Sequence, residues 1–357
     1  MAYAGTRSFD SGGTSALTNG HVTRREVVLD DIAYKQAIEA PLVSTLERWS
    51  INSVTPEWLM GKIESDFDAA TITGDKEGAE HTPSDIRYRV RAQNYTQIKS
   101  KNVSVSRTQR RMNEIGTGDE YAIELWESTK ALTQEFEKCL LFGEAKKGAS
   151  GTAQIMEGMF SWALETSAAG TVTIADRDIP DPYKSTMKAG SSVDMTLDEF
   201  NEDVLQAGWE KGMDYSQAMM LCGGGMKRII SKYGMVYSGS GATMTATPLN
   251  ERTVPAMAHR LSDRIDIYDS DFGPIYIHKN RYFNDKTNSY TINSIAIKPG
   301  TAFIIFEPRY VKLCVLDGFK HYPLGKNGDN TRGFVNAELS LCVKNPRALV
   351  GGYNLVA

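Results

Sequence analysis

Residues 117–142 read TGDEYAIELWESTKALTQEFEKCLLF, the longest helical signal in the chain. Apolar side chains recur in this segment at spacings of three and four, which predicts one apolar stripe along a helix. The stripe consists of Ala122, Leu125, Leu132, Phe136, Cys139 and Leu140. Thr117 and Glu120 have the spacing of a capping box, and Gly143 predicts the end of the helix. At a rise of about 1.5 Å per residue, the helix would be about 39 Å long.

The predicted helix is acidic, with six carboxylates and two lysines between residues 117 and 142. Negative charge at its start, on Asp119 and Glu120, suits the positive end of the helix dipole. We expect the later glutamates to lie on the surface, away from the apolar stripe. They are Glu124, Glu127, Glu135 and Glu137.

The stretch before the helix is basic and mainly extended. Apolar residues at 86, 88, 90 and 92 alternate with Arg87, Arg89 and Arg91, which is the period of a strand. Between residues 85 and 111 there are eight positive charges against one negative charge. The other five are Lys99, Lys101, Arg107, Arg110 and Arg111. A basic arm and an acidic helix could pair within one subunit or between neighbours, or form two separate solvated faces.

Composition sets the outer limits of function. The 357 residues suffice for about two domains. A net charge of -4 gives the chain no global attraction to nucleic acid or to an anionic membrane. The sequence has neither an apolar run of the roughly 20 residues needed to span a bilayer nor the pattern of a signal peptide, so we expect a cytoplasmic protein. The four cysteines are far apart and predict buried thiols rather than disulfides or a zinc site.

The remaining chain predicts a polar arm, a small α/β layer and a closing set of strands. Residues 1–25 are poor in large apolar side chains and predict a flexible arm that is ordered only against neighbours. Thr196 and Glu199 form a second capping box, ahead of a helix to about Lys211. Its expected apolar face contains Leu197, Phe200, Val204, Leu205 and Trp209. A strand at 218–222, a helix at 226–233 and strand runs at 295–297, 302–306, 311–315 and 333–343 follow.

Motifs that suggest chemistry are incomplete. GGGMKR at 223–228 lacks the spacing and the Lys-Ser/Thr ending of a phosphate-binding loop. The kinase triplet DFG at 271–273 stands alone and lies between two predicted strands, so a hairpin turn is expected there. The five histidines are scattered. We therefore expect no catalytic residues, no metal site and no cofactor.

Three stretches carry a resemblance to a known family. They are NYTQIKSKNVSVSRTQ at 94–109, IYDSDFGPIYIHKNRYF at 267–283 and GFVNAELSLCVKNPRALVGGYNL at 333–355. With the order of elements, they make the chain resemble the major capsid proteins of tailed bacteriophages, which have the α+β Hong Kong 97-like fold. The resemblance implies an N-terminal arm (1–55), an extended loop (56–110), a peripheral domain (111–195) with spine helix 117–142, an axial domain (196–290) and a returning peripheral-domain sheet (291–357).

The resemblance also implies a function and partners. Pentamers and hexamers would tile an icosahedral shell around double-stranded DNA, with portal and scaffold proteins as partners, room for a cement or decoration protein, and no membrane. The extended loop would lie over a neighbouring subunit and place charged side chains at the boundary. These interface candidates are Arg87, Arg89, Arg91, Arg107, Arg110, Glu120, Glu124, Glu127 and Glu135.

Two other functions stay open at this stage. An encapsulin-like cellular compartment uses the same fold and would need a pocket for a cargo peptide. A DNA-binding protein could use the basic hairpin, and would then bind DNA as isolated subunits at low salt.

Overall fold

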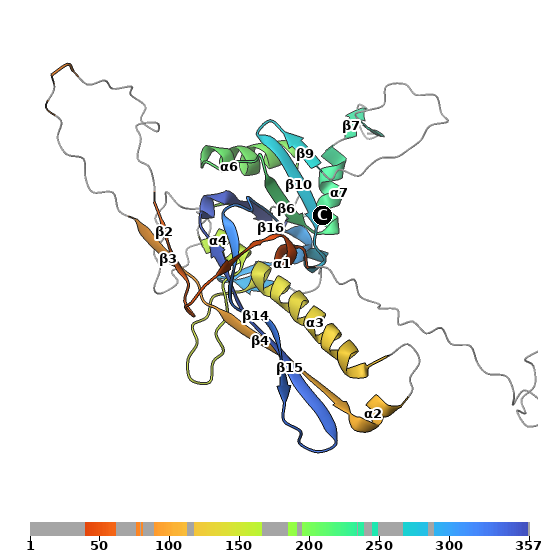
Figure 1. Ribbon diagram of the computed structural model, residues 1–357. Helices are drawn as coiled ribbons and strands as arrows, with labels where there is room; N and C mark the ends of the chain where they lie inside the picture. The colour runs from red at the N-terminus through yellow and green to blue at the C-terminus, as the bar shows by residue number, and fades with distance from the viewer. Residues whose placement is uncertain are drawn as a thin grey trace, which may run out of the picture.

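The computed structural model describes residues 40–61, 76–78, 80, 89–112, 118–165, 185–190, 195–233, 235–238, 245–248, 267–284 and 289–355. Long strands and one long helix form an elongated part, and an α/β part lies at one end of it (Figure 1). The predicted arm at 1–25 lies outside the described residues.

The elongated part is built on a four-stranded sheet with the order β1-β14-β15-β4. Its strands are β1 (Glu47–Ser50), β14 (Val311–Leu324), β15 (Asn330–Val343) and β4 (Gln97–Ser106). β14 and β15 are antiparallel and longer than predicted, and β1 joins the edge in parallel. Burial is complete at the start of β14 and absent at its end, whereas β15 still buries Val335 and Ala337. Only the tip of the β14–β15 hairpin therefore extends beyond the core.

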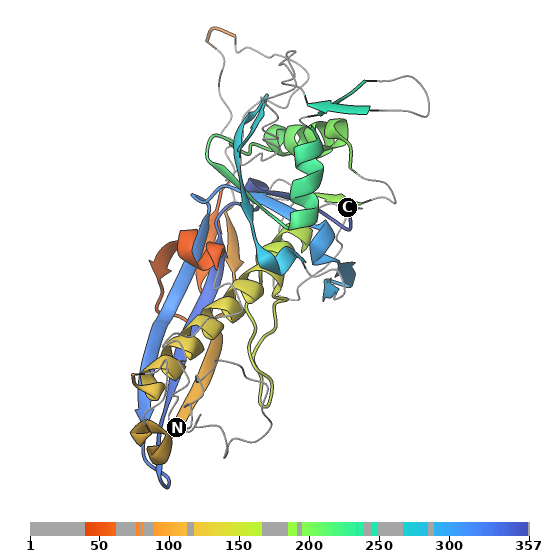
Figure 2. The same cartoon turned by 90° about the vertical axis from the view of Figure 1, so that its right-hand side faces the viewer.

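The long helix α3 (Glu120–Phe142) runs alongside β4 and β15 (Figure 2). Leu132, Phe136 and Leu140 are fully buried, which confirms the central part of the predicted stripe. Ala122 is exposed, because α3 buries side chains fully only from Leu132 onward, and Leu125 packs against the core while half-buried.

The predicted cap of α3 is wrong, although the predicted end is correct. Asp119 is the N-cap, and its carboxylate accepts the Tyr121 amide at 3.2 Å, since Asp caps as well as Thr. Thr117 lies outside the described residues. Gly143 ends the helix with a negative φ, which any residue can adopt. Glycine is required there because a Cβ would lie 2.5 Å from the Met156 carbonyl oxygen.

The α/β part contains a six-stranded sheet with the order β5-β16-β13-β6-β10-β9. The strands are β5 (Thr186–Ala189), β16 (Leu349–Tyr353), β13 (Phe303–Phe306), β6 (Ala218–Cys222), β10 (Gly273–Lys279) and β9 (Ile267–Ser270). All four residues of β13 are buried. Ile304 and Phe306 belong to the core that includes α3, whereas Phe303 and Ile305 belong to a second core on the opposite face. Strands from both sides of residue 290, the expected domain boundary, thus share one sheet.

One continuous helical segment covers the second core. It consists of α5 (Leu197–Glu199), the π-helical η4 (Phe200–Gln206) and α6 (Ala207–Glu210). The capping box of Thr196 and Glu199 is confirmed. Trp209, predicted to be buried, is 56% exposed, and its ring packs on the half-buried Phe272 with ring centroids 5.7 Å apart. Phe272 is in the β9–β10 turn, so the DFG triplet is a hairpin turn as expected.

The other elements are short. The helices are α1 (Pro41–Thr45), α2 (Arg107–Arg111), α4 (Met159–Glu165) and α7 (Gly224–Tyr233), with 3-10 turns η5 (Arg281–Asn284), η6 (Pro299–Thr301) and η7 (Pro346–Ala348). The strand pairs are β2 (Glu57–Met60) with β3 (Val90–Gln93), β7 (Met235–Ser238) with β8 (Thr245–Pro248), and β11 (Tyr290–Ile292) with β12 (Ile295–Ile297). All four cysteines are free thiols, and Cys222, Cys314 and Cys342 are buried as predicted.

Candidate subunit-interface surfaces

The β2–β3 pair carries the predicted basic row. Ala92 is fully buried and Arg89 and Arg91 are exposed, so the alternation is confirmed where the strand is described. The Arg91 guanidinium lies 3.2 Å from the Glu57 carboxylate on the paired strand, with both side chains largely exposed. Arg89 forms no ion pair with any described residue. Arg87 lies outside the described residues.

A second group of charges joins β4 to α3 within the subunit. Alternate residues of β4 face inward, and this places Lys99 and Lys101 beside the helix. Their ammonium groups lie 3.2 Å and 2.5 Å from the Glu135 carboxylate. Burial acts to raise the pKa of Glu135, but hydrogen bonds to Lys101 and Lys99 and their charges outweigh it, so the pKa is lowered. Part of the basic arm therefore pairs with the acidic helix inside one chain.

The remaining glutamates of the predicted interface lie nearer the start of α3. Glu120, Glu124 and Glu127 are half-buried. Neither Glu124 nor Glu127 forms an ion pair with a described residue, whereas Glu120 has contacts of its own. The predicted approach of Arg87, Arg89 and Arg91 to such carboxylates across a subunit boundary stays a prediction.

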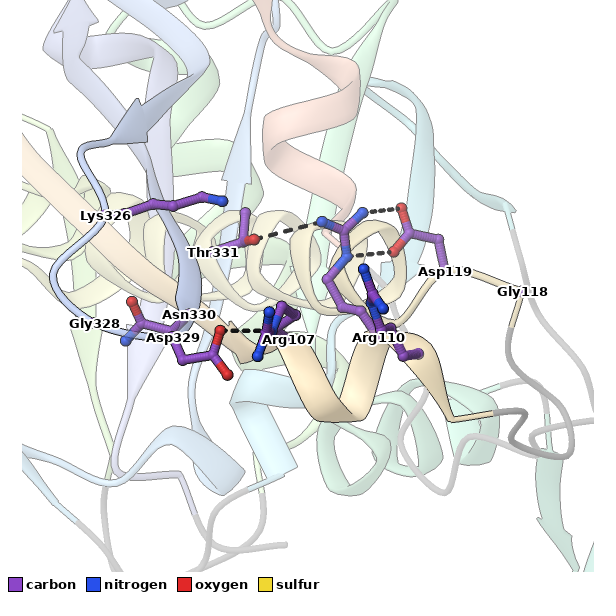
Figure 3. A pocket seen from close by; sticks show the side chains of 10 residues that line it. Arg107, Arg110, Gly118, Asp119, Lys326, Gly328, Asp329, Asn330 and Thr331 are labelled. Atoms are coloured by element: carbon purple, nitrogen blue, oxygen red, sulfur yellow. Dashed lines mark hydrogen bonds and ion pairs between the residues drawn. The ribbon is translucent and has the colours of Figure 1, made fainter.

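Charged side chains also line a hollow of about 450 Å³ at the far end of the elongated part (Figure 3). α2, the first residues before α3 and the turn between β14 and β15 form it. Arg107 Nε lies 2.8 Å from Asp329 Oδ1. The Arg110 fork donates to both Asp119 oxygens at 3.3 Å, and its third nitrogen lies 3.4 Å from the Thr331 hydroxyl. Arg107 and Arg110, two interface candidates, thus lie together.

The expectation that Glu137 lies on the surface is wrong. This α3 residue is fully buried and accepts three hydrogen bonds: from the Leu42 and Val43 amides at 3.0 Å each, and from Asn280 Nδ2 at 2.7 Å. Burial raises its pKa, and the three N–H donors oppose that rise. Ala40, the N-cap of α1, offers no side-chain cap, so a carboxylate from a distant helix caps α1. Its partners are 94 to 143 residues away in sequence, which explains why local pattern missed it.

The described part of the chain has neither a membrane-spanning helix nor a metal-binding cluster. No helix there has both the length and the apolar character needed to cross a membrane. The same residues contain no group of three or more His, Cys, Asp or Glu side chains that could hold a metal ion.

Comparison with known proteins identifies the family. A model of the SU10 major capsid protein family matches residues 8–355. The chain belongs to this family. It is accordingly a structural subunit of a bacteriophage capsid, as the sequence resemblance implied. A search of curated proteins gave no match.

Solved capsids share the fold. The cyanophage A-1(L) capsid subunit aligns with a TM-score of 0.61 and 12% identity, over 96% of this chain and all of that one. A subunit of the native GTA particle capsid aligns with a TM-score of 0.60 and 10% identity, over 97% and 100%. These likenesses confirm the α+β Hong Kong 97-like fold. The holo-SrpI encapsulin of Synechococcus elongatus PCC 7942 aligns less well, with a TM-score of 0.51 and 10% identity over 94% of both chains.

Proposed function

We propose that this capsid subunit assembles as pentamers and hexamers into a closed icosahedral shell around double-stranded DNA and has no catalytic activity. The observation that carries the proposal is the apolar surface of its extended elements. Large apolar side chains stay exposed on or beside the strands of the elongated part and the β2–β3 pair. They are Trp49, Leu59, Ile98, Met112 and Leu324, and Leu59 and Ile98 are 60% and 61% exposed. Contact with neighbouring copies would bury them, as shell assembly requires.

Ion pairs within the chain reduce the number of charged residues that are available for contacts between subunits. Glu135 already holds two lysines of its own chain, and Arg91 already holds Glu57. Arg89 remains exposed immediately before β3, and Glu124 and Glu127 have no ion pair among the described residues. The proposal therefore places Arg89 of one subunit against Glu124 or Glu127 of the next. An exposed pair contributes about 0 to 1 kcal/mol, but a shell repeats it in every copy.

The DNA is enclosed rather than bound through the basic arm. Five of the eight cations between residues 85 and 111 form ion pairs with carboxylates of the same chain. A phosphate backbone would have to displace those carboxylates, because binding through lysine and arginine requires charges free to replace counterions. This disfavours the alternative of a DNA-binding protein. The proposal includes assembly in the host cytoplasm with portal and scaffold proteins, and leaves room for a cement or decoration protein.

Electron microscopy and light scattering of the purified full chain, alone and with a co-expressed scaffold, test the proposal. We expect closed shells or capsomers of five and six copies. DNA should be protected from nuclease inside particles from infected cells and bind weakly to free subunits. A compact monomer under every assembly condition would contradict the shell, and tight DNA binding by free subunits would favour the rival.

A further inference from the structure

The hollow at the far end of the elongated part has an excess of positive charge. Four cations line it, Arg107, Arg110, Arg111 and Lys326, against two carboxylates, Asp119 and Asp329. A net charge of +2 results from these six side chains, whereas the chain as a whole carries -4. The hollow is therefore a local basic site on an acidic protein.

Two of the four cations are held in place and two are available. Arg107 and Arg110 each form an ion pair with an aspartate of the hollow. Arg111 and Lys326 form no ion pair with any described residue. In Figure 3 the Lys326 side chain extends along the hollow, on the same side as the Arg110 guanidinium. The two available charges give the hollow capacity for a further anion.

We propose that this hollow binds an acidic peptide segment of another protein, with two carboxylates of the segment on Arg111 and Lys326. Guanidinium and ammonium groups form strong charge-assisted hydrogen bonds with carboxylates. The arginines that are already paired in this hollow hold carboxylates, so the local geometry suits that group. The inference deepens the proposed function, because such a protein would attach to the shell through this end of each subunit.

Two other occupants fit less well. A second copy offering the same end would bring another excess of positive charge, because its own Asp119 and Asp329 are already paired. A DNA duplex carries closely spaced, rigid rows of phosphates. Such rows would meet both aspartates of the hollow, whereas a flexible peptide can place its carboxylates at the two available cations only.

The test uses the full chain and labelled peptides. We expect fluorescein-labelled hexaglutamate to bind the wild-type protein at low salt, and hexaglutamine not to bind. Arg111→Glu and Lys326→Glu should each weaken hexaglutamate binding at least about tenfold, since each removes a charged hydrogen bond. Arg111→Gln, which keeps a polar side chain, should weaken it by a smaller factor. Lys298→Glu is the matched control: Lys298 is exposed, lies between β12 and η6, and carries the same charge change.

Several results would overturn the inference. One is a lack of hexaglutamate binding; another is an equal loss of binding in Lys298→Glu, which would mean general charge attraction. A third is that a DNA duplex of about 20 base pairs binds more tightly than the peptide and that Arg111→Glu and Lys326→Glu abolish this binding. Weaker association between copies in Lys326→Glu, with unchanged peptide binding, would assign the hollow to a contact between subunits. Peptide binding can be measured whether or not the chain assembles. A failure of assembly would therefore contradict the proposed function without deciding whether the hollow binds acidic peptides.

Discussion

Removing the buried carboxylate of Glu137 should destabilise the subunit by several times the effect of an ordinary surface substitution. In Glu137→Ala the amides of Leu42 and Val43 and the Asn280 side chain lose their acceptor. A buried donor left unsatisfied costs about 1 to 3 kcal/mol, so the three together reach about 3 to 9 kcal/mol. The variant also avoids burying a carboxylate, which offsets part of that loss. We expect a net loss of about 3 to 5 kcal/mol in the free energy of unfolding.

Two further variants test whether the loss comes from the hydrogen bonds of Glu137. Glu137→Gln keeps one acceptor oxygen for Leu42 and Asn280 but faces the Val43 amide with an NH2 group, so a loss of about 1 to 3 kcal/mol is expected. Glu135→Gln, two residues earlier on the same helix, is the matched control. It weakens a half-exposed pair with two lysines and should cost less than about 1 kcal/mol.

Urea unfolding of the unassembled chain, followed by circular dichroism, measures these losses. Hydrogen exchange adds a local readout, because the Leu42 and Val43 amides should lose protection in Glu137→Ala. A loss below about 1 kcal/mol with both amides still protected would refute the role of Glu137 as the cap of α1.

The two glutamates also predict opposite pH dependence. Burial raises the pKa of Glu137 above the ordinary 4.5. Between its unfolded and folded pKa values the folded chain binds more protons, so the contribution of Glu137 to stability falls as pH rises through that window. The pKa of Glu135 is lowered, so its contribution is present above the ordinary pKa and is lost as pH falls through the folded value. Glu137→Gln should remove the first trend and Glu135→Gln the second in urea unfolding measured across pH.

Three other predictions concern assembly and packing. Arg89→Glu should impair shell formation with little change in unfolding free energy, and Glu127→Lys should partly restore it; an additive double-mutant cycle in an assembly assay would refute the pairing. Gly143→Ala should lower the unfolding free energy by about 1 to 3 kcal/mol, because its Cβ would meet backbone oxygens at 2.5 and 2.6 Å; unchanged urea midpoints would contradict this. Deletion of residues 1–25 should leave the circular dichroism spectrum unchanged and impair assembly, and shells as stable as those of the full chain would argue against a structural arm.

Local pattern predicted the elements of this fold well where the period of apolar residues matches one buried face. The core of α3, the second capping box and the strand at 218–222 follow from such patterns. Pattern failed where contacts come from distant segments. Glu137 follows the buried Phe136 on the helix and looks like a surface residue until the amides of α1 are placed beside it. Trp209 has helical spacing to Leu205, but its ring contacts Phe272 of the distant β9–β10 turn and stays 56% exposed.

The sequence predicted which segments carry the charges of the candidate interface, but it did not predict which charges pair with one another. A basic arm and an acidic helix are visible in the sequence, and both lie in the expected elements. Which charges pair depends on strand alternation and on the sheet order. These bring Lys99 and Lys101 to Glu135 and leave Arg89 free of ion pairs among the described residues. Sequence could not separate the contacts within a subunit from those available to a neighbour.

Strand β13 contributes to both cores, and its register against the neighbouring strand β16 has to be fixed by some feature of the sequence. In a strand with one buried face, a register shift of one residue turns the apolar side chains toward solvent. The free-energy cost of that exposure fixes the register of the strand. Residues 303–306 are all apolar and all buried, so a slip would only exchange one apolar pair for the other. The apolar pattern of β13 therefore does not distinguish one alignment with β16 from the next.

Two glycines of β16 supply the missing distinction. A Cβ on Gly351 would lie 2.6 Å from the Phe303 carbonyl oxygen, and one on Gly352 would lie 2.8 Å from the Phe303 ring. A slip in one direction brings Val350 to the place of Gly351, and a slip in the other brings Tyr353 to the place of Gly352. Either shift puts a side chain where the structure has room only for hydrogen. Steric exclusion at these two positions, rather than hydrophobic patterning, therefore sets how the strand joining the two cores is aligned.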